Sequence, residues 1–231
     1  KFYAAGTEEL QKEVKLFCQE GKPPLFPQKQ PLALIVPHAG YIFSGKVAAS
    51  GYNQLLPDQL PERVFILVSS HQYRFPGVSV FTSGNYETPL GPVQVDCLTG
   101  ESLLKSDPLF INREEYHLRE HSLEVQLPFL QHILGNQLRI VPLVLGIHDP
   151  EECRKLSKAL QPWFNNKNLF VISSDFSHYP EYRDAINSDK ATSEAILINS
   201  PQHLLKILEK NRKQKIPGLA TSLCGWTSVL T

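Results

Sequence analysis

Residues 32–45 read LALIVPHAGYIFSG, and this stretch decides the fold. Its five apolar residues, 32–36, are followed at once by Pro37 and His38, and then by a small-residue segment that can open a helix. An apolar run that proline and glycine end predicts a buried strand. Side chains at the carboxyl end of such a strand lie where ligands bind in open α/β sheets. His38 is therefore the first candidate for a functional residue.

The same pattern occurs twice more along the chain. The apolar run 64–68 leads into Ser-Ser-His at 69–71, and the run 169–172 leads into Ser-Ser-Asp-Phe-Ser-His at 173–178. The carboxyl ends of parallel strands meet at one edge of a sheet. We therefore expect His38, His71, Asp175 and His178 to converge in one pocket.

The remaining segments alternate between strand-like and helix-like patterns. Strands are predicted at 63–68, 139–145 and 168–173, and helices at 7–19, 44–56, 99–105, 122–134, 150–163, 181–198 and 201–213. This alternation predicts a single α/β domain over residues 1–231, with three layers and a largely parallel sheet. Thr7 is the expected N-cap of the first helix, and Pro128 is expected to kink or divide the helix at 122–134. Residues 78–95 predict a β excursion that walls the pocket.

Composition excludes several classes of function. Lysine plus arginine equals aspartate plus glutamate at 23 each, so no global positive field favours nucleic acid or an anionic membrane surface. No apolar run approaches the ~20 residues of a membrane span, and the amino end lacks the apolar core of a secretory signal. We expect a cytoplasmic protein, unless a signal has been removed upstream. The absence of methionine indicates a fragment, a processed form or a sequence from which modified methionines are missing.

Neutral imidazole is the commonest protein metal ligand, and His38 and His71 are both aimed by the strand ends that precede them. We interpret them as metal ligands, against the alternative of half-buried histidines with satisfied hydrogen bonds. Asp175 and His178 lie three residues apart, which suits an acid/base histidine supported by a carboxylate. The alternative is an N-cap aspartate followed by a surface histidine.

The four cysteines are far apart and predict neither a disulfide framework nor a paired zinc motif. Cys224 precedes a helix start, which would lower the pKa of its thiol and favour the thiolate, although a buried core role fits equally well. Glu120 and His121 head a helix; capping accounts for the glutamate, and His121 can face the pocket and bind substrate. Tyr41 can stack on a substrate or pack in the core.

Five motifs together resemble the Memo family: PHAGY at 37–41, SSH at 69–71, EHSLE at 120–124, SSDFSH at 173–178 and CG at 224–225. In prokaryotes this is the AmmeMemoRadiSam system protein B group, and its eukaryotic member is the mediator of ErbB2-driven cell motility. The resemblance covers nearly the whole chain, which stops before the family's usual carboxyl-terminal strand segment. It implies a fold like that of class III extradiol dioxygenases.

The resemblance also implies roles for single residues. His38 and His71 match the two histidine ligands of those dioxygenases, Cys224 takes the place of their carboxylate ligand, and His178 matches the acid/base histidine, with Asp175 beside it. It implies one metal ion, with iron or copper favoured over zinc, and we expect that purification can remove it. A thiolate ligand shifts the preference of a site towards softer metals.

The function implied is that of a metal-dependent oxidoreductase acting on a small, aromatic or phenolic substrate. Two alternatives stay open. One is a binding module for an anionic peptide or phosphopeptide, for which Arg74, Arg113 and Arg119 are the basic residues nearest the motifs. The other is a metal-free enzyme with Cys224 as nucleophile and His178 as its base. Prokaryotic relatives occur with a radical-SAM protein, which implies a functional association.

Overall fold

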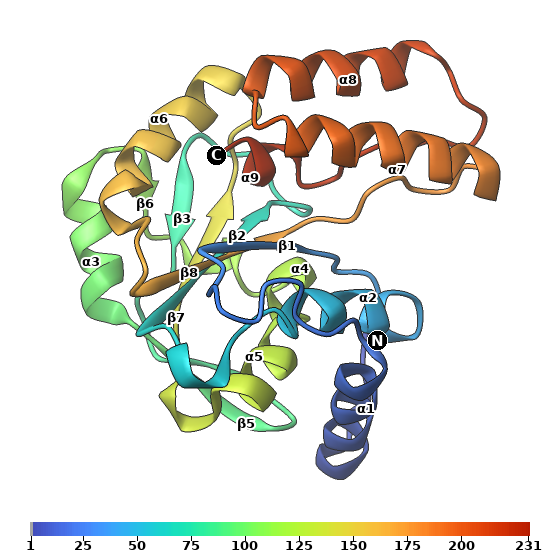
Figure 1. Cartoon of the computed structure of the whole chain (residues 1–231). Coiled ribbons are helices and arrows are strands. Elements are labelled where there is room, and N and C mark those ends of the chain that lie inside the picture. The colour runs from blue at the N-terminus through green and yellow to red at the C-terminus, as the bar shows by residue number, and fades with distance from the viewer. Residues whose placement is uncertain (1) are drawn as a thin grey trace.

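The central strands carry buried apolar side chains on both faces. In β2 (Arg63–Ser69), Val64, Ile66 and Val68 pack on one side, and Phe65 and Leu67 pack on the other. The computed structural model, which describes residues 2–231, places this strand in the interior of the sheet (Figure 1). A strand with two apolar faces needs a layer of helices on each face.

Over residues 2–231 the sheet has eight strands and is largely parallel, as the sequence predicts. The strands along its main path are, in spatial order, β1 (Ala33–Val36), β8 (Asn168–Ser173), β2, β7 (Arg139–Leu145), β3 (Val78–Val80) and β6 (Phe110–Ile111). The first four run parallel to one another, whereas β3 runs antiparallel to β7. The carboxyl ends of β1, β8 and β2 therefore meet at one edge of the sheet.

Helices cover both faces, which confirms the three-layer α/β domain (Figure 1). One face packs against α1 (Thr7–Glu20), α2 (Tyr41–Tyr52), α4 (His121–Glu124) and α5 (Leu127–Leu134). The other packs against α3 (Cys97–Ser106), α6 (Pro150–Leu160) and α9 (Trp226–Leu230). A smaller cluster joins the neighbouring helices α7 (Tyr182–Leu197) and α8 (Pro201–Lys213) to the loop before α9.

The strand that leads to His38 is less buried than its sequence predicts. Among the described residues, β1 pairs with β8 alone and forms an edge of the sheet. The side chain of Ile35 is consequently 38% exposed, and it borders a groove of about 590 Å³ that Phe170 and Leu230 also line. An apolar run predicts contact with a core, but it does not reveal whether both faces of the strand are covered.

The predicted break in the helix at 122–134 is present. α4 ends at Glu124, and α5 begins at Leu127 with Pro128 in its first turn, where the missing N–H of proline costs no helical hydrogen bond. The prediction of Thr7 as N-cap is wrong, because Gly6 occupies that position and the Thr7 hydroxyl donates to the Pro89 carbonyl (2.7 Å).

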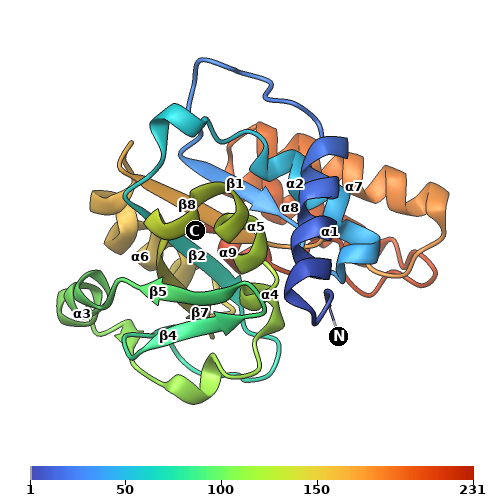
Figure 2. The same cartoon turned by 90° about the horizontal axis from the view of Figure 1, so that it is seen from below.

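The β excursion at 78–95 lies elsewhere than predicted. It contains β3 and a hairpin of β4 (Asn85–Thr88) and β5 (Gly91–Val95), seen from below in Figure 2. β5 pairs in parallel with the first residues of β7, with Val95 opposite Ile140. The hairpin therefore extends from the amino-terminal ends of the strands and does not wall a pocket at their carboxyl ends.

Within residues 2–231, no helix combines the length and the apolar character that crossing a membrane requires.

Candidate metal centre

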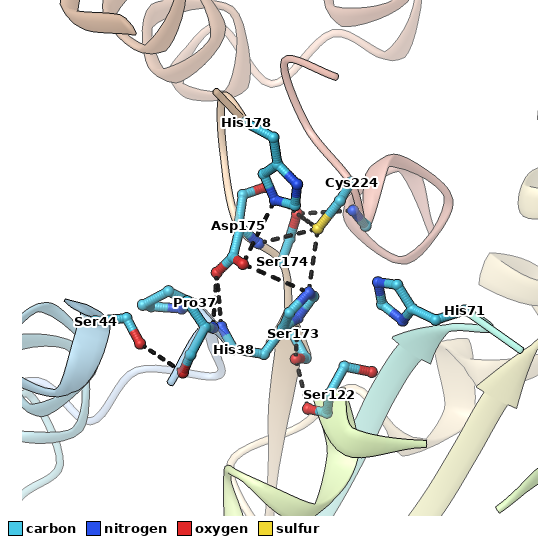
Figure 3. Close-up of polar contacts among 12 residues, drawn as sticks. Pro37, His38, Ser44, His71, Ser122, Ser173, Ser174, Asp175, His178 and Cys224 are labelled. Carbon is cyan, nitrogen blue, oxygen red and sulfur yellow. Dashed lines mark hydrogen bonds and ion pairs between the residues drawn. The ribbon is translucent and has the colours of Figure 1, made fainter. Parts of the chain in front are cut away.

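The structure brings five of the predicted site residues together at the carboxyl edge of the sheet (Figure 3). His38 follows β1, His71 follows β2, Asp175 and His178 follow β8, and Cys224 precedes α9. The ring centroids of His38 and His71 lie 5.0 Å apart, and Cys224 Sγ lies 3.2 Å from His38 Nε2.

Backbone hydrogen bonds hold the Cys224 loop against the loop that follows β8. The N–H of His178 donates to the Thr221 carbonyl (3.0 Å), and the N–H of Cys224 donates to the Asp175 carbonyl (3.2 Å). Gly225 lies so close to β8 that a Cβ atom there would be 2.6 Å from the Ser173 carbonyl oxygen. The position of the sulfur is therefore set by the backbone of two paired loops.

His38 is buried and is oriented by hydrogen bonds on one side of its ring. Its Nδ1 lies 2.8 Å from Ser173 Oγ. That hydroxyl donates its one hydrogen to the Ser122 carbonyl (2.7 Å) and accepts from Gln126 Nε2 (3.0 Å). Ser173 Oγ must therefore accept from His38 Nδ1–H, because its own hydrogen is already used. This assignment leaves Nε2 of His38 facing Cys224.

His71 is oriented in the same sense by a carboxylate. The Glu120 side chain is fully buried and lies 2.9 Å from His71 Nδ1, and its second oxygen accepts the backbone N–H of His71 at 2.8 Å. Hydrogen bonds from His71 and Ser122 outweigh the effect of burial and hold the pKa of Glu120 below its usual value. An ionised carboxylate can only accept, so His71 donates from Nδ1 and its Nε2 is free for a proton or a metal.

Cys224 carries a stabilised thiolate. Burial alone would raise the pKa of its thiol, but interactions with His178, His38 and His71 outweigh it and lower the pKa to about 4. The backbone N–H of Asp175 also donates to the sulfur, at 3.2 Å. For His71, burial would lower the pKa, but its interactions with Cys224 and Glu120 raise it to about 10. At neutral pH the Cys224 thiolate and the His71 imidazolium thus form a partly buried pair of opposite charges.

Asp175 connects the β1 turn with His178. Its Oδ1 accepts the backbone N–H groups of His38 (2.7 Å) and Ala39 (3.2 Å), and its Oδ2 lies 3.5 Å from His178 Nε2. The interaction with Asp175, and then that with Cys224, raises the pKa of His178 to about 9. Burial would raise the pKa of Asp175, but its contacts with His178 and His38 lower it to about 2.

His121 also faces this cluster, from the first turn of α4. Its ring lies 4.9 Å from that of His71 and 5.6 Å from that of His38, between centroids. Phe2 stacks on it at 4.5 Å, with an angle of 12° between the ring planes. Tyr41, by contrast, is 3% exposed in the core, where its hydroxyl donates to the Val125 carbonyl. The structure therefore places Tyr41 in the packing role and away from the histidine cluster.

Potential ligand atoms fall into two overlapping groups within residues 2–231. One group is His38, His71 and His121; the other is His38, Asp175 and Cys224; within each, the ligand atoms lie within 4.8 Å of one another. His71 and Cys224, both predicted as ligands, therefore stand in different groups. The chemistry of both groups suits a transition metal, because they offer imidazole nitrogen, thiolate and carboxylate.

Sequence reasoning missed the residues that aim the histidines. Gln126 and Phe2 lie outside the motifs, and Ser173 lies within SSDFSH but carried no predicted role, since the partners of all three are distant in the chain. For Glu120 a signal existed, because an acidic residue directly before His121 at a helix start can cap the helix and also reach a neighbouring strand end.

Comparisons with known proteins show which sequences this chain is similar to. A family model described as Memo-like protein matches residues 1–231. A MEMO1 family protein of Desulfurococcus amylolyticus is 35% identical over 217 residues, covering 91% of this chain and 74% of the relative. One from Aquifex aeolicus is 37% identical over 214 residues, covering 91% of this chain and 77% of the relative. One from Ignicoccus hospitalis is 36% identical over 222 residues, with 90% and 77% covered.

Proposed function

The chain belongs to the Memo family, and from that premise we propose that it is a metal-dependent oxidoreductase with an acid/base histidine, acting on a small substrate. The observation that carries the proposal is the shared orientation of two histidines. Ser173 and Glu120 engage Nδ1 of His38 and His71, so both rings keep Nε2 available beside the Cys224 thiolate. This is the arrangement of a metal site whose ligands are fixed by a surrounding layer of hydrogen bonds.

The residues present fit a metal ion. His38, His71 and Cys224 are the proposed ligands, and Asp175 Oδ2 lies 3.8 Å from His38 Nε2, near enough to join them. Three protein ligands leave coordination positions for substrate. A metal bound here would orient the substrate and oxygen and exchange electrons with them. Iron or copper suits a site with a thiolate best, with zinc as the alternative.

His178 supplies proton transfer in this proposal. Its Nε2 is buried and, among the described residues, has no hydrogen-bond partner, although the Asp175 carboxylate lies within ion-pair distance. The Cys224 thiolate contributes to the raised pKa of His178. A cation bound to the sulfur would remove that contribution and bring the pKa closer to neutral, where an imidazole can take a substrate proton and return it.

The proposal is tested with Co²⁺ as a spectroscopic probe. Wild-type protein should bind one equivalent and show a thiolate-to-cobalt charge-transfer band, and Cys224→Ser should lose that band. Iron- or copper-loaded protein should then consume oxygen with a phenolic substrate from a panel, and His178→Asn should lose this activity while keeping its metal. A wild-type protein without the charge-transfer band would overturn the ligand assignment, and full activity in His178→Asn would overturn the acid/base role.

A metal-free nucleophilic enzyme is the second candidate, and the lowered pKa of Cys224 favours it. Alkylation with iodoacetamide separates the two. Metal ligation should protect Cys224 and a chelator should restore its labelling, whereas a free nucleophile should react quickly with or without metal. Because the pKa is about 4, labelling of chelated protein should be nearly independent of pH between about 6 and 8.

The hypothesis of an anionic-peptide module stays a prediction. Arg74, Arg113 and Arg119 are all exposed, which makes them accessible to such a peptide. For each of these functions we propose a cytoplasmic location, where reducing conditions keep thiols such as that of Cys224 in the reduced form.

A further inference from the structure

Three imidazole rings meet in the candidate metal centre, from three different segments of the fold. His38, His71 and His121 each offer a ring nitrogen, and these nitrogens lie within 4.8 Å of one another. Cys224 and Asp175 form a separate group with His38. His38 is thus shared by a nitrogen-only group and a group that contains sulfur and a carboxylate.

His121 differs from its two neighbours in what its nitrogens contact. His38 and His71 each have Nδ1 bound to a buried partner. His121 Nδ1 instead lies 3.8 Å from Glu120 Oε1, beyond hydrogen-bond distance, and that oxygen already accepts from His71 and from the Ser122 hydroxyl. Within residues 2–231, the structure shows no side-chain hydrogen bond for His121. Its lone pair is therefore available to a ligand.

Packing restricts the ring of His121 without consuming its nitrogens. Phe2 stacks on one face of the ring, and the Phe2 carbonyl is held by the backbone N–H of Tyr41 at 2.8 Å. The His121 side chain is 24% exposed, so it lies at the open side of the cluster. An aromatic ring held in plane by stacking, with one nitrogen within 4.8 Å of ligand nitrogens of two other imidazoles, loses little freedom on binding a cation.

The distances are compatible with closure around an ion. In a tetrahedral site with metal–nitrogen bonds of about 2.0–2.1 Å, ligand nitrogens stand roughly 3.3 Å apart. Starting from separations of at most 4.8 Å, each approach needs a movement of roughly 1.5 Å or less. Small shifts shared by the three side chains can supply such a movement, with His121 moving within the plane of its stacked ring.

We propose that the metal centre has a second metal position, made by His38, His71 and His121, which overlaps the thiolate position by sharing its histidines and which holds borderline divalent ions such as Co²⁺, Ni²⁺, Cu²⁺ or Zn²⁺ when the thiolate does not bind them. Imidazole suits these ions, whereas the thiolate position favours softer ones such as Cu(I). The two positions exclude each other, so the metal centre holds one ion, which lies at the thiolate position while Cys224 binds it and at the nitrogen-only position when Cys224 is absent. This inference rests on the proposed function only in that the pocket binds a metal.

The test uses Co²⁺ titrations of the whole chain, followed by visible absorption and by metal content after gel filtration. Cys224→Ser should still bind one equivalent of Co²⁺, with ligand-field bands but no thiolate charge-transfer band. Adding His121→Phe to this variant should lower the affinity at least tenfold, since one of three remaining ligands is lost. His121→Phe alone should keep the thiolate charge-transfer band.

Two controls keep the test decisive. His132→Phe in the Cys224→Ser background is the matched control, because His132 lies in the last turn of α5 and belongs to neither ligand group; its Co²⁺ affinity should be unchanged. His121→Gln replaces His121→Phe if circular dichroism shows that the latter is unfolded. Loss of all Co²⁺ binding in Cys224→Ser, or equal affinity with and without His121, would overturn the nitrogen-only position. A wild-type protein without any metal binding would instead reject the proposed function.

Discussion

Both oxygens of Glu120 bind His71: Oε1 accepts from the ring Nδ1 at 2.9 Å, and Oε2 accepts from the backbone N–H at 2.8 Å. One buried carboxylate thus fixes the turn after β2 and the orientation of the ring it carries. Rotating the ring to present Nδ1 to a metal would leave a buried charge without its partner, which is strongly unfavourable.

Replacing this carboxylate by an amide should weaken metal binding without unfolding the protein. In Glu120→Gln, one carboxylate oxygen becomes an NH₂ group, which cannot accept a hydrogen bond. Either the ring Nδ1–H or the backbone N–H of His71 therefore loses its acceptor. Loss of such an outer ligand typically costs ten- to a hundredfold in metal affinity. Competition titration with a chromophoric chelator measures this change. Glu124→Gln on the exposed side of α4 is the matched control, and an unchanged affinity in Glu120→Gln would refute the role assigned to Glu120.

Removing the charge of Asp175 should lower the pKa of His178. Asp175 is the largest cause of the increase to about 9, and it lies 3.5 Å from His178 Nε2. In Asp175→Asn, we expect a fall of roughly one unit or more, since a neighbouring carboxylate typically contributes 1–3 units. NMR titration of the ring resonances in chelated protein reports the value. Asp189→Asn is the matched control. It changes the carboxylate that accepts the Ser177 N–H, and it should leave the pKa of His178 unchanged. A pKa that is the same in wild type and Asp175→Asn would contradict the pairing.

A histidine outside the pocket should make stability depend on pH. His117 is buried, with Nδ1 2.9 Å from Tyr86 Oη and Nε2 3.0 Å from Ser79 Oγ, and burial lowers its pKa to about 4 from 6.5. The unfolded chain therefore binds a proton at higher pH than the folded chain does. Its contribution to stability is complete above about pH 6.5 and is lost as the pH falls towards 4, amounting to roughly 2 kcal/mol by pH 5.

Urea unfolding at pH 7.5 and pH 5 measures this loss. His117→Gln cannot titrate, so it should be less stable than wild type at pH 7.5 but should lose roughly 2 kcal/mol less between the two pH values. Identical losses in the two proteins would show that His117 is not responsible.

The parts of the structure that sequence predicted well are those with a local cause. The strands at 139–145 and 168–173 are correct at both ends, because an apolar run bounded by polar residues marks a buried strand. The gathering of His38, His71 and Asp175 followed from the same rule, since parallel strands end at one edge. This prediction did not require the order of the strands in the sheet.

The parts that could not be predicted depend on contacts between distant segments. The amide–hydroxyl–imidazole chain of Gln126, Ser173 and His38 joins three segments of the fold, and the sequence around Gln126 and Ser173 does not indicate that they reach His38. Tyr41 follows the His38 turn directly, but the helical rotation of α2 turns its ring towards Phe129 and the core. The exposure of β1 depends on what covers the sheet edge, which the strand's own sequence does not encode.

Because of Gly225, the two neighbouring positions 224 and 225 tolerate substitution to different extents. Any side chain at this position would meet the Ser173 carbonyl oxygen at 2.6 Å and Ser174 Cβ at 2.8 Å, so the loop would have to leave the sheet. The neighbouring residue faces no such limit, because Cys224 is placed by its backbone and only its terminal atom meets the histidines. A substitution at 224 changes the chemical type of one metal ligand atom and leaves its position unchanged. A substitution at 225 displaces that ligand atom, whichever residue provides it. Single substitutions at position 224 can therefore change the metal preference of this fold. Gly225 keeps the loop close to β8, so a new ligand atom at position 224 would lie in the same place as the sulfur.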